Sequence, residues 1–185
     1  MPFDIASFRS AFTADGARPN LFEVEMVFPG FATDAGAASK QLTFMCKTAA
    51  LPGSTLGTVP LQYFGREVKL AGNRTFADWT ITVLNDEDFR VRRAFESWMG
   101  GINSHSTNLR VSGANSSSGY TTDPVVRQYS KSGGTIKSYQ LIGAFPSDLA
   151  QIDLDWGSND TLEEYSVTLS YQYWVTMGDP SPGTA

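Results

Sequence analysis

The side chains able to perform acid–base or nucleophilic chemistry are few, and they do not form a recognisable set. The chain has one histidine, His105, and one cysteine, Cys46. A Ser–His–acid triad needs an imidazole held in place by a buried acid, whereas His105 lies in a loop-like stretch. Cys46 falls on the apolar face of an alternating strand, which favours a small buried residue over a nucleophile. We therefore interpret His105 as a surface residue and expect no enzyme activity.

A metal site and a phosphate site are also disfavoured. Asp153, Asp155 and Glu164 fall at the acidic positions of a twelve-residue calcium loop, but Ser158 occupies the place where such a loop needs glycine. We interpret this segment as a solvated acidic turn, and calcium uptake at micromolar concentration would overturn that interpretation. The glycine patterns of dinucleotide and P-loop sites are missing. Paired carboxylates for sugar hydrolysis stay open, because their spacing is three-dimensional. The sequence predicts no cofactor and no metal.

The charge balance is more informative. The 185 residues carry a net charge of −5, the opposite of the usual balance in proteins that hold nucleic acid tightly. From 138 to 185 there are acids but no Lys or Arg. This pattern indicates either a solvated acidic face or a surface that repels phosphates or pairs with a basic partner. The acidic surface candidates are Asp153, Asp155, Asp160, Glu163 and Glu164.

Length and composition predict one domain. A hydrophobic share of 41% in 185 residues is typical of a globular chain of about one domain's length. No run approaches the roughly 20 apolar residues that span a bilayer. Asp4 stands where a secretory signal would carry positive charge, and a single cysteine fits a reducing compartment. We expect a soluble protein made in a cytoplasm.

Strict alternation of apolar and polar residues predicts strands with one buried face. The strongest case is 165–175, where Tyr, Val and Leu residues alternate with Ser, Thr and Gln. Further strands are expected at 22–28, 42–46, 79–83, 125–130 and 135–145. Residues 56–71 read as a hairpin that turns near Gly65.

One helix is expected over 86–100. The acids at 86–88 would favour its positive end, and Val91, Phe95, Trp98 and Ile102 form one apolar stripe. Gly100 and Gly101 offer a stop. The arginines of this helix lie off the stripe and should face solvent or a partner; they are Arg90, Arg92 and Arg93. A short helix at 3–12 would use Phe3, Phe8 and Phe12 as anchors.

Three segments have the composition of loops or tails that lie outside the core. These are 29–40 and 103–123, both expected to be flexible, and a tail at 177–185 expected to be disordered. The remainder of 1–176 predicts a mainly β fold: a small β-barrel or sandwich with one flanking α-helix and a long extended hairpin. The last strand carries no charge on its non-core face. It is either a central strand or an edge strand that another copy of the chain covers.

Longer stretches of the sequence resemble the tail tube proteins of contractile-tailed bacteriophages. The stretches are ARPNLFEVE (17–25), the run from CKTAALPGSTLG to ITVLNDED (46–88), FESW (95–98) and the run from VVRQYSKSGG to VTLSYQYW (125–174). The combination of 46–88 with the LDW segment and the last strand is specific, and the resemblance covers nearly all of 1–176.

The resemblance implies a structural virion protein. Six copies would form a ring, and stacked rings would form the hollow inner tail tube through which the genome passes when the sheath contracts. Sheets of neighbouring copies would join into one barrel around the lumen. The implied partners are the tail sheath outside, the tape-measure protein and transiting double-stranded DNA inside, and the baseplate tube initiator and tail terminator at the ends.

The same resemblance implies roles for particular residues. The segment 46–70 matches the family's long hairpin, which reaches the adjacent ring, so the inter-ring candidates are Pro52, Gly53, Pro60, Tyr63 and Arg66. The helix 86–100 matches the family's outward helix, so Arg90, Arg92 and Arg93 are sheath-facing candidates. Two alternatives remain. One is the tube of a contractile injection particle such as a bacteriocin, and the other is a monomeric β-sandwich binding module that uses the 103–123 loop.

Overall fold

The computed structural model describes residues 4–12 and 16–178. The predicted anchor Phe3 and residues 179–185 of the predicted tail (177–185) lie outside these residues, whereas Met177 is not part of a disordered tail because it is the last residue of a strand. The helices are α1 (Ile5–Ser10), α2 (Ala35–Met45), α3 (Arg90–Ile102), the 3₁₀ turn η1 (Ser112–Ala114) and α4 (Ser117–Tyr120). The strands are β1 (Phe22–Glu25), β2 (Cys46–Ala49), β3 (Thr55–Tyr63), β4 (Arg66–Thr75), β5 (Trp79–Leu84), β6 (Val125–Tyr129), β7 (Thr135–Ile142), β8 (Phe145–Leu149), β9 (Glu164–Ser170) and β10 (Tyr173–Met177).

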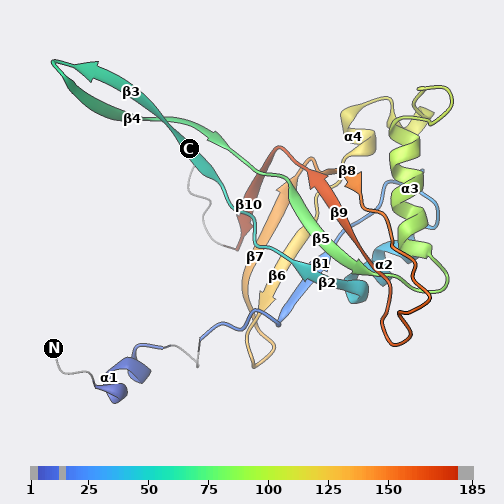
Figure 1. Ribbon diagram of the computed structural model, residues 1–185, viewed down its shortest axis with the longest axis horizontal. Coiled ribbons are helices and arrows are strands. Elements are labelled where there is room, and N and C mark those ends of the chain that lie inside the picture. Colours follow the sequence, from blue (N-terminus) through green and yellow to red (C-terminus); the bar gives the residue numbers. More distant parts are fainter. Residues whose placement is uncertain (1–3, 13–15, 179–185) are drawn as a thin grey trace.

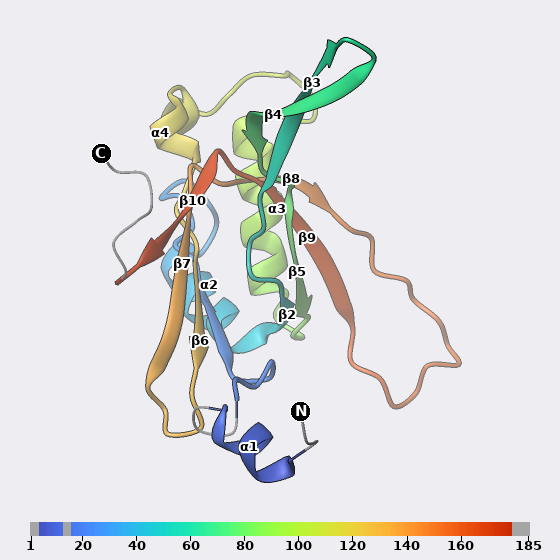
Figure 2. The same ribbon diagram turned by 90° about the vertical axis from the view of Figure 1, so that its left-hand side faces the viewer.

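Two four-stranded antiparallel sheets face each other, which confirms the predicted mainly β class. The first sheet has the order β1-β6-β7-β10, and the second has the order β2-β5-β9-β8. Figure 2 shows the two sheets on either side of α3, which closes the space between them. The inner faces and the helices α2 and α3 form one hydrophobic core, which includes Val24, Val126, Leu141, Ile81, Val167, Leu169, Phe95 and Trp98.

Alternation predicted several of these strands correctly. Val24, Met26 and Phe28 are buried, and Val27 between them is exposed. Trp79, Ile81 and Val83 are buried along β5 in the same way. Both segments therefore place one face in the core, as the period of two requires.

The predicted apolar stripe of α3 is confirmed, but both ends of the helix differ from the prediction. Phe95 and Trp98 are fully buried, and their rings pack against Phe28 at centroid distances of 4.9 and 5.8 Å. The helix begins at Arg90 because Phe89 adopts a left-handed φ of 51°. Gly101 lies inside the helix and is buried, so the two glycines do not stop it.

The segment 29–40 is not a flexible excursion, and 42–46 is not a strand. Residues 35–45 form α2, whose Ala38 and Leu42 are fully buried in the core. Ser39 fixes the helix to the preceding segment, because its hydroxyl accepts a hydrogen bond from the Phe28 N–H at 3.0 Å. Only Cys46 continues into a strand, β2.

The predicted strand 165–175 is divided between the two sheets. Alternation holds through Tyr171, after which the chain leaves β9 and enters β10 in the first sheet. The segment 135–145 is divided in the same way, since β7 ends at Ile142 and β8 begins at Phe145 in the other sheet. The two crossings lie together, because the Gln172 N–H donates to the Ile142 carbonyl at 3.0 Å.

The segment 103–123 is partly structured, contrary to the prediction of a flexible loop. It contains η1 and α4, and Ala114 is fully buried. The Trp98 indole donates to the Tyr120 carbonyl at 2.7 Å, and the Val111 N–H donates to the Gly101 carbonyl at 3.0 Å. These bonds hold the segment against α3.

Strands β3 and β4 form a hairpin that extends away from both sheets (Figure 1). Its turn is at Phe64 and Gly65, both with positive φ (45° and 78°), as a tight two-residue hairpin requires. This confirms the predicted turn near Gly65. All nine residues of β3 are exposed, so the hairpin adds nothing to the core.

Candidate assembly surfaces

The base of the hairpin is tied to both sheets. The carbonyl of Gly53 accepts a hydrogen bond from the Trp174 indole of β10 at 3.1 Å. On the other side, the Ala50 carbonyl accepts one from the Trp79 indole of β5 at 2.7 Å. Pro52 lies between these two anchored carbonyls and is half-buried. Pro52 and Gly53 therefore set the direction in which the hairpin leaves the body and do not belong to its far end.

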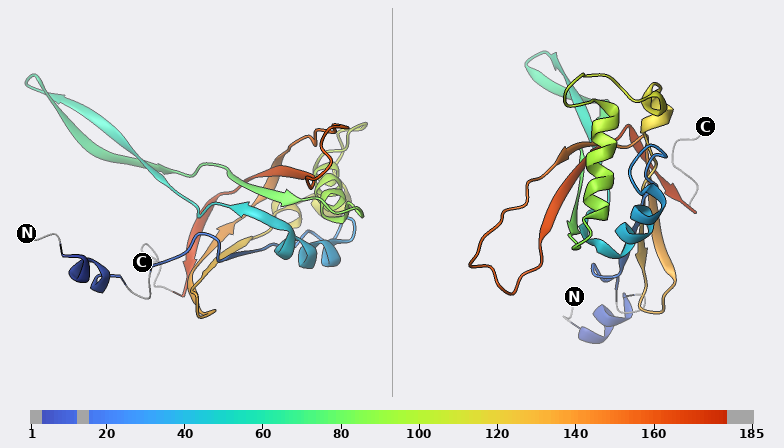
Figure 3. Two further views of the ribbon diagram at one scale, coloured as in Figure 1. Left: turned by 60° about the horizontal axis from the view of Figure 1, so that its bottom comes forward. Right: turned by 90° about the vertical axis from the view of Figure 1, so that its right-hand side faces the viewer.

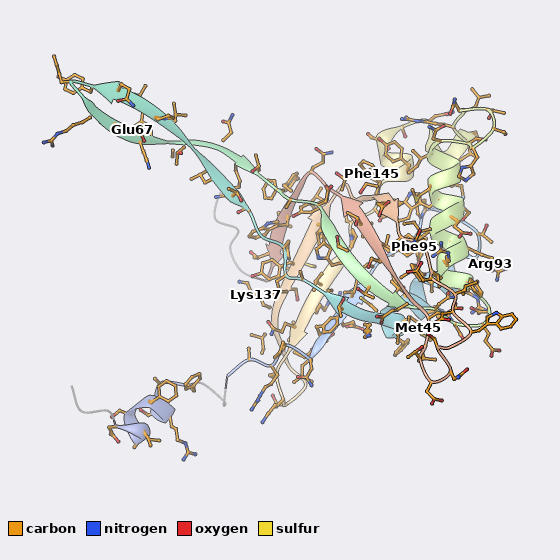
Figure 4. The ribbon with its side chains drawn as sticks, in the orientation of Figure 1. Met45, Glu67, Arg93, Phe95, Lys137 and Phe145 are labelled. Atoms are coloured by element: carbon orange, nitrogen blue, oxygen red, sulfur yellow. The ribbon has the colours of Figure 1, made fainter. Side chains whose placement is uncertain are left out.

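The hairpin has one apolar and one polar face. In the antiparallel register Val59 lies opposite Leu70, and Leu61 lies opposite Val68. Cross-strand partners point to the same side, so these four residues share a face that Tyr63 and Arg66 continue toward the turn. The opposite face carries Thr58, Pro60, Gln62, Glu67, Lys69 and Ala71. Figure 4 shows side chains on both sides of the ribbon, with Glu67 far from the body.

The apolar face of the hairpin has no cover within the described part of the chain. Val59, Leu61, Val68 and Leu70 are all exposed. A two-stranded ribbon alone is only marginally stable in water, and a continuous exposed apolar surface marks an interaction site. At the turn, Phe64 is almost fully exposed, and its ring contacts Tyr63 at a centroid distance of 4.5 Å.

The four sheet edges differ in how they resist pairing with another chain. β8 contains Pro146, and its pairing with β9 shifts register between Pro146 and Asp148; both features block edge-to-edge pairing. β10, the sequence YWVTM, has no charge and no proline. The edge interpretation of the last predicted strand therefore holds for β10, whereas β9 lies between β5 and β8 as a central strand.

The other edge of the first sheet, β1, carries two glutamates that are neutralised locally. Arg127 on β6 lies 2.6 Å from the Glu25 carboxylate and 3.7 Å from that of Glu23. The hydrogen bond to Glu25 raises the pKa of Arg127. Tyr129 donates to Glu23, and this bond raises the pKa of Tyr129. The cluster was missed from sequence, although the pairing of 22–25 with 125–128 could have indicated it.

The three arginines of α3 lie in different environments. Arg92 is turned toward the second sheet, where its side chain is only 17% exposed. Its guanidinium donates to the Ala150 carbonyl at 3.1 Å and lies 5.1 Å from the Tyr165 ring centroid. Arg93 is exposed and donates to the Asp88 carbonyl at 2.8 Å. Arg90 pairs with the Asp88 carboxylate at 3.1 Å and is half-buried, so Arg93, labelled in Figure 4, is the most exposed of the three.

The acidic candidates lie on the connection from β8 to β9, residues 150–163, and at the start of β9. Glu163 accepts from the Asn85 amide at 2.8 Å, and Glu164 pairs with Lys47. Asp155 closes a turn by accepting the Gly157 N–H at 3.0 Å. Asp160 lies in the same exposed connection. Two of the five acids therefore bond to other elements, and the others belong to a projecting loop.

The chemistry-bearing residues do not converge among residues 4–12 and 16–178. No group of three or more His, Cys, Asp and Glu side chains lies together there. His105 is exposed. Burial raises the pKa of the Cys46 thiol to about 12, which disfavours the nucleophilic thiolate. Within the same residues, the helices are too short or too polar to cross a membrane.

Relatives of the chain are tail tube proteins. The sequence model of the family described as phage tail tube protein matches residues 17–177. Tail tube protein gp19 of Enterobacteria phage T4 is 35% identical over 163 residues, covering 88% of this chain and 93% of the phage protein. The tail tube protein of Serratia phage KSP90 is 27% identical over 169 residues, covering 90% and 93%.

Solved structures show the same fold at low sequence identity. A chain of the anti-feeding prophage baseplate has a TM-score of 0.60 at 15% identity and covers 90% of this chain and 98% of its own. A chain of the sheath–tube complex of an extracellular contractile injection system has a TM-score of 0.53 at 15% identity, covering 94% and 97%. The sequence matches over most of the chain and the shared fold agree: the chain belongs to the phage tail tube protein family.

Proposed function

We propose that six copies of this chain form a ring and that stacked rings form the hollow inner tube of a contractile phage tail. The tube is enclosed by a sheath and holds the tape-measure protein, and later double-stranded DNA, in its lumen. A baseplate initiator and a tail terminator close its ends. Assembly takes place in the host cytoplasm, and the product is a virion component.

The observation that carries this proposal is the uncovered apolar face of the β3–β4 hairpin. Val59, Leu61, Val68 and Leu70 are exposed in the single chain, although burying such side chains fully stabilises by about 1.5–3 kcal/mol each. The hairpin reaches well beyond the body (Figure 1). A copy in the adjacent ring is the partner that this reach and this apolar face fit.

The edges of the first sheet support lateral contacts within a ring. The strands β1, β6, β7 and β10 alternate in direction, so β10 of one copy meets β1 of the next in antiparallel orientation when the ring axis runs along the strands. The unguarded β10 edge favours this pairing, and Arg127 lowers the cost of the two β1 glutamates beside it. Ring closure then removes all free edges from this sheet.

The charge of the chain suits a conduit for DNA. Each copy carries −5, so a ring of six carries −30. Phosphate contacts by Lys and Arg add salt-sensitive affinity and drag, and an acidic wall avoids both. Replacing lumen acids with Lys is expected to slow DNA delivery, and unchanged delivery would contradict this electrostatic role.

The test compares two facing pairs on opposite sides of the hairpin by electron microscopy of assembled protein, with tube seeds present. Leu61→Ser with Val68→Ser removes apolar-face contacts, and we expect folded monomers without tubes. Gln62→Ser with Glu67→Ser alters the polar face at the same depth and should leave tubes intact. Circular dichroism checks folding. Normal tubes from the apolar-face variant would refute the hairpin role, and wild-type protein that never forms rings or tubes, even with seeds, would refute the assembly itself.

A contractile injection particle is the second candidate, favoured by the fold shared with the anti-feeding prophage chain. The subunit would stack in the same way but would conduct protein or ions. The sequence identity to phage tail tube proteins favours the phage assignment. Capsid and terminase genes beside the coding gene would support a phage tail, and their absence would support the particle.

A further inference from the structure

Helix α1 and the residues up to Phe12 form an N-terminal arm that the described part of the chain leaves uncovered. None of its residues is buried, and Figure 1 shows it well beyond the sheets. Ile5, Phe8 and Phe12 follow the helical spacing i, i+3, i+7, yet all three are exposed. The rings of Phe8 and Phe12 contact each other at a centroid distance of 5.0 Å. Aligned apolar side chains of this kind indicate a docking surface.

Two arginine side chains lie beside the apolar side chains of the arm. A shallow cleft next to α1 is lined by Ala6, Arg9, Ser10, Phe12 and Arg18. The described acid of the arm, Asp4, is bound to the helix start, where it accepts from the Ala6 N–H at 3.0 Å. Arg9 and Arg18 are therefore the charged side chains that the described residues bring to the cleft. The family match begins at residue 17, so α1 lies before the matched residues.

A second exposed surface has the complementary character. The loop 150–163 carries Leu154 (80% exposed), Trp156 (100%) and Leu162 (74%), and it contains Asp153, Asp155 and Asp160 without any Lys or Arg. The loop is held in shape, because Asp155 accepts from the Gly157 N–H and Asp153 accepts from the Gln151 amide at 2.9 Å. Figure 3 shows it projecting from the body beside β9.

We propose that the arm of one copy docks on the 150–163 loop of a neighbouring copy, with Phe8 and Phe12 against Trp156 and with Arg9 and Arg18 facing Asp153 and Asp155. The proposal rests on the proposed assembly of the chain into a tube. Exposed tryptophan and arginine side chains are the residue types that dominate binding energy at interfaces. The contact would clamp copies together through an element outside the matched family region.

The partner of the arm is a second copy of the chain, as the positions of the arm and the loop and their charged side chains indicate. In Figure 1 the arm lies toward the same end of the long axis as the β3–β4 hairpin, whereas the loop lies near the other end of the same chain. The hairpin is a poorer partner for the arm, since its described basic residues, Arg66, Lys69 and Arg74, outnumber Glu67. Like charges across an interface disfavour it, and opposite charges favour the acidic loop.

Cysteine cross-linking in assembled tubes tests the contact between copies. One chain carries Cys46→Ala and Ser10→Cys, and a second, longer-tagged chain carries Cys46→Ala and Ser158→Cys. We expect mild oxidation of mixed tubes to give the disulfide-linked heterodimer. A control chain with Ser106→Cys in place of Ser158→Cys should give none. Tubes without the heterodimer would overturn the proposal, and so would a disulfide formed within one chain that carries both cysteines.

Charge reversal provides a second, independent readout. Arg9→Asp with Arg18→Asp, or Asp153→Arg with Asp155→Arg, should each lower the temperature at which tubes dissociate, and combining all four changes should restore it. Unchanged dissociation in the separate variants, or no recovery in the combination, would overturn the contact. If wild-type protein never forms tubes, the assembly proposal fails instead, so the two failures are distinguishable.

Discussion

Two adjacent glycines in α3 offer a matched test of how the helix packs on the body. The Cβ of an alanine at Gly100 would have no heavy atom within 4 Å outside its local surroundings. At Gly101 the Cβ would lie 2.4 Å from Cε2 and 2.7 Å from Cδ2 of Phe31, and 3.3 Å from a Val111 methyl group. The two variants therefore differ in packing while sharing the same change in helix propensity.

The magnitudes follow from these contacts. Replacing a helical glycine with alanine stabilises by about 0.5–1 kcal/mol, and Gly100→Ala should raise the free energy of unfolding by that amount. Gly101→Ala gains the same but forces the Phe31 ring to move, and overpacking of this kind costs about 1–3 kcal/mol. We expect Gly101→Ala to lower the free energy of unfolding by about 1–2 kcal/mol.

Urea unfolding of the unassembled chain, followed by tryptophan fluorescence, measures both values. Midpoints that do not depend on protein concentration establish that monomers are being compared. A Gly101→Ala variant as stable as Gly100→Ala would refute the close approach of Phe31 to the helix. A loss of stability in Gly100→Ala would show that this glycine, and not Gly101, is the one the structure requires.

Two further predictions concern partly buried polar side chains, Arg92 and Cys46. Arg92→Leu should lower the free energy of unfolding by about 1–2 kcal/mol, because the carbonyl of Ala150 and the ring of Tyr165 lose their cation. In the same urea assay, Arg93→Leu should lower it by less than about 0.5 kcal/mol. Equal losses in the two variants would contradict the inward position of Arg92. Because burial raises the pKa of Cys46 to about 12, the native thiol should react with iodoacetamide at pH 8 at least tenfold more slowly than in urea, and comparable rates would contradict its burial.

The β architecture could be predicted from sequence because one face of most strands is buried. Val24, Met26 and Phe28, like Trp79, Ile81 and Val83, show the period of two directly. The hairpin was recognisable for a different reason, since Gly65 marks a tight turn between two extended runs. Its isolation from the body was not predictable from alternation, because exposed and buried alternation look the same in sequence; only the resemblance to tail tube proteins implied it.

The missed helix α2 shows where composition misleads. Its small residues resemble a loop, and Leu42, Phe44 and Cys46 imitate a strand. The spacing of Ala35, Ala38, Leu42 and Met45 is helical, and alanine is the strongest helix former. Phe44, which the strand interpretation placed in the core, is exposed. Tertiary contact with the core, through Ala38 and Leu42, decided the outcome.

The division of the last predicted strand could not be recognised locally. Alternation continues to Tyr171 without a proline or glycine to mark the break, and the break depends on pairing with the distant crossing at 142–144. The same long-range contact separates a central strand, β9, from an uncharged edge, β10. The sequence pattern was compatible with a central strand and with an edge strand, and the topology assigns the first to β9 and the second to β10.

The apolar side chains fall into two groups, those in the core that serve folding and those on the surface that serve assembly. The core is closed by α2 and α3 between the two sheets, so a single copy can fold before it meets another. The apolar face of the hairpin, the β10 edge and Trp156 lie outside that core. A monomer with such surfaces must avoid random aggregation. Charged side chains oppose it in two places: Glu67 and Lys69 on the polar face of the hairpin, and the acidic residues around Trp156. Assembly is then favoured only where several of these weak surfaces engage at once, as at the end of a growing tube.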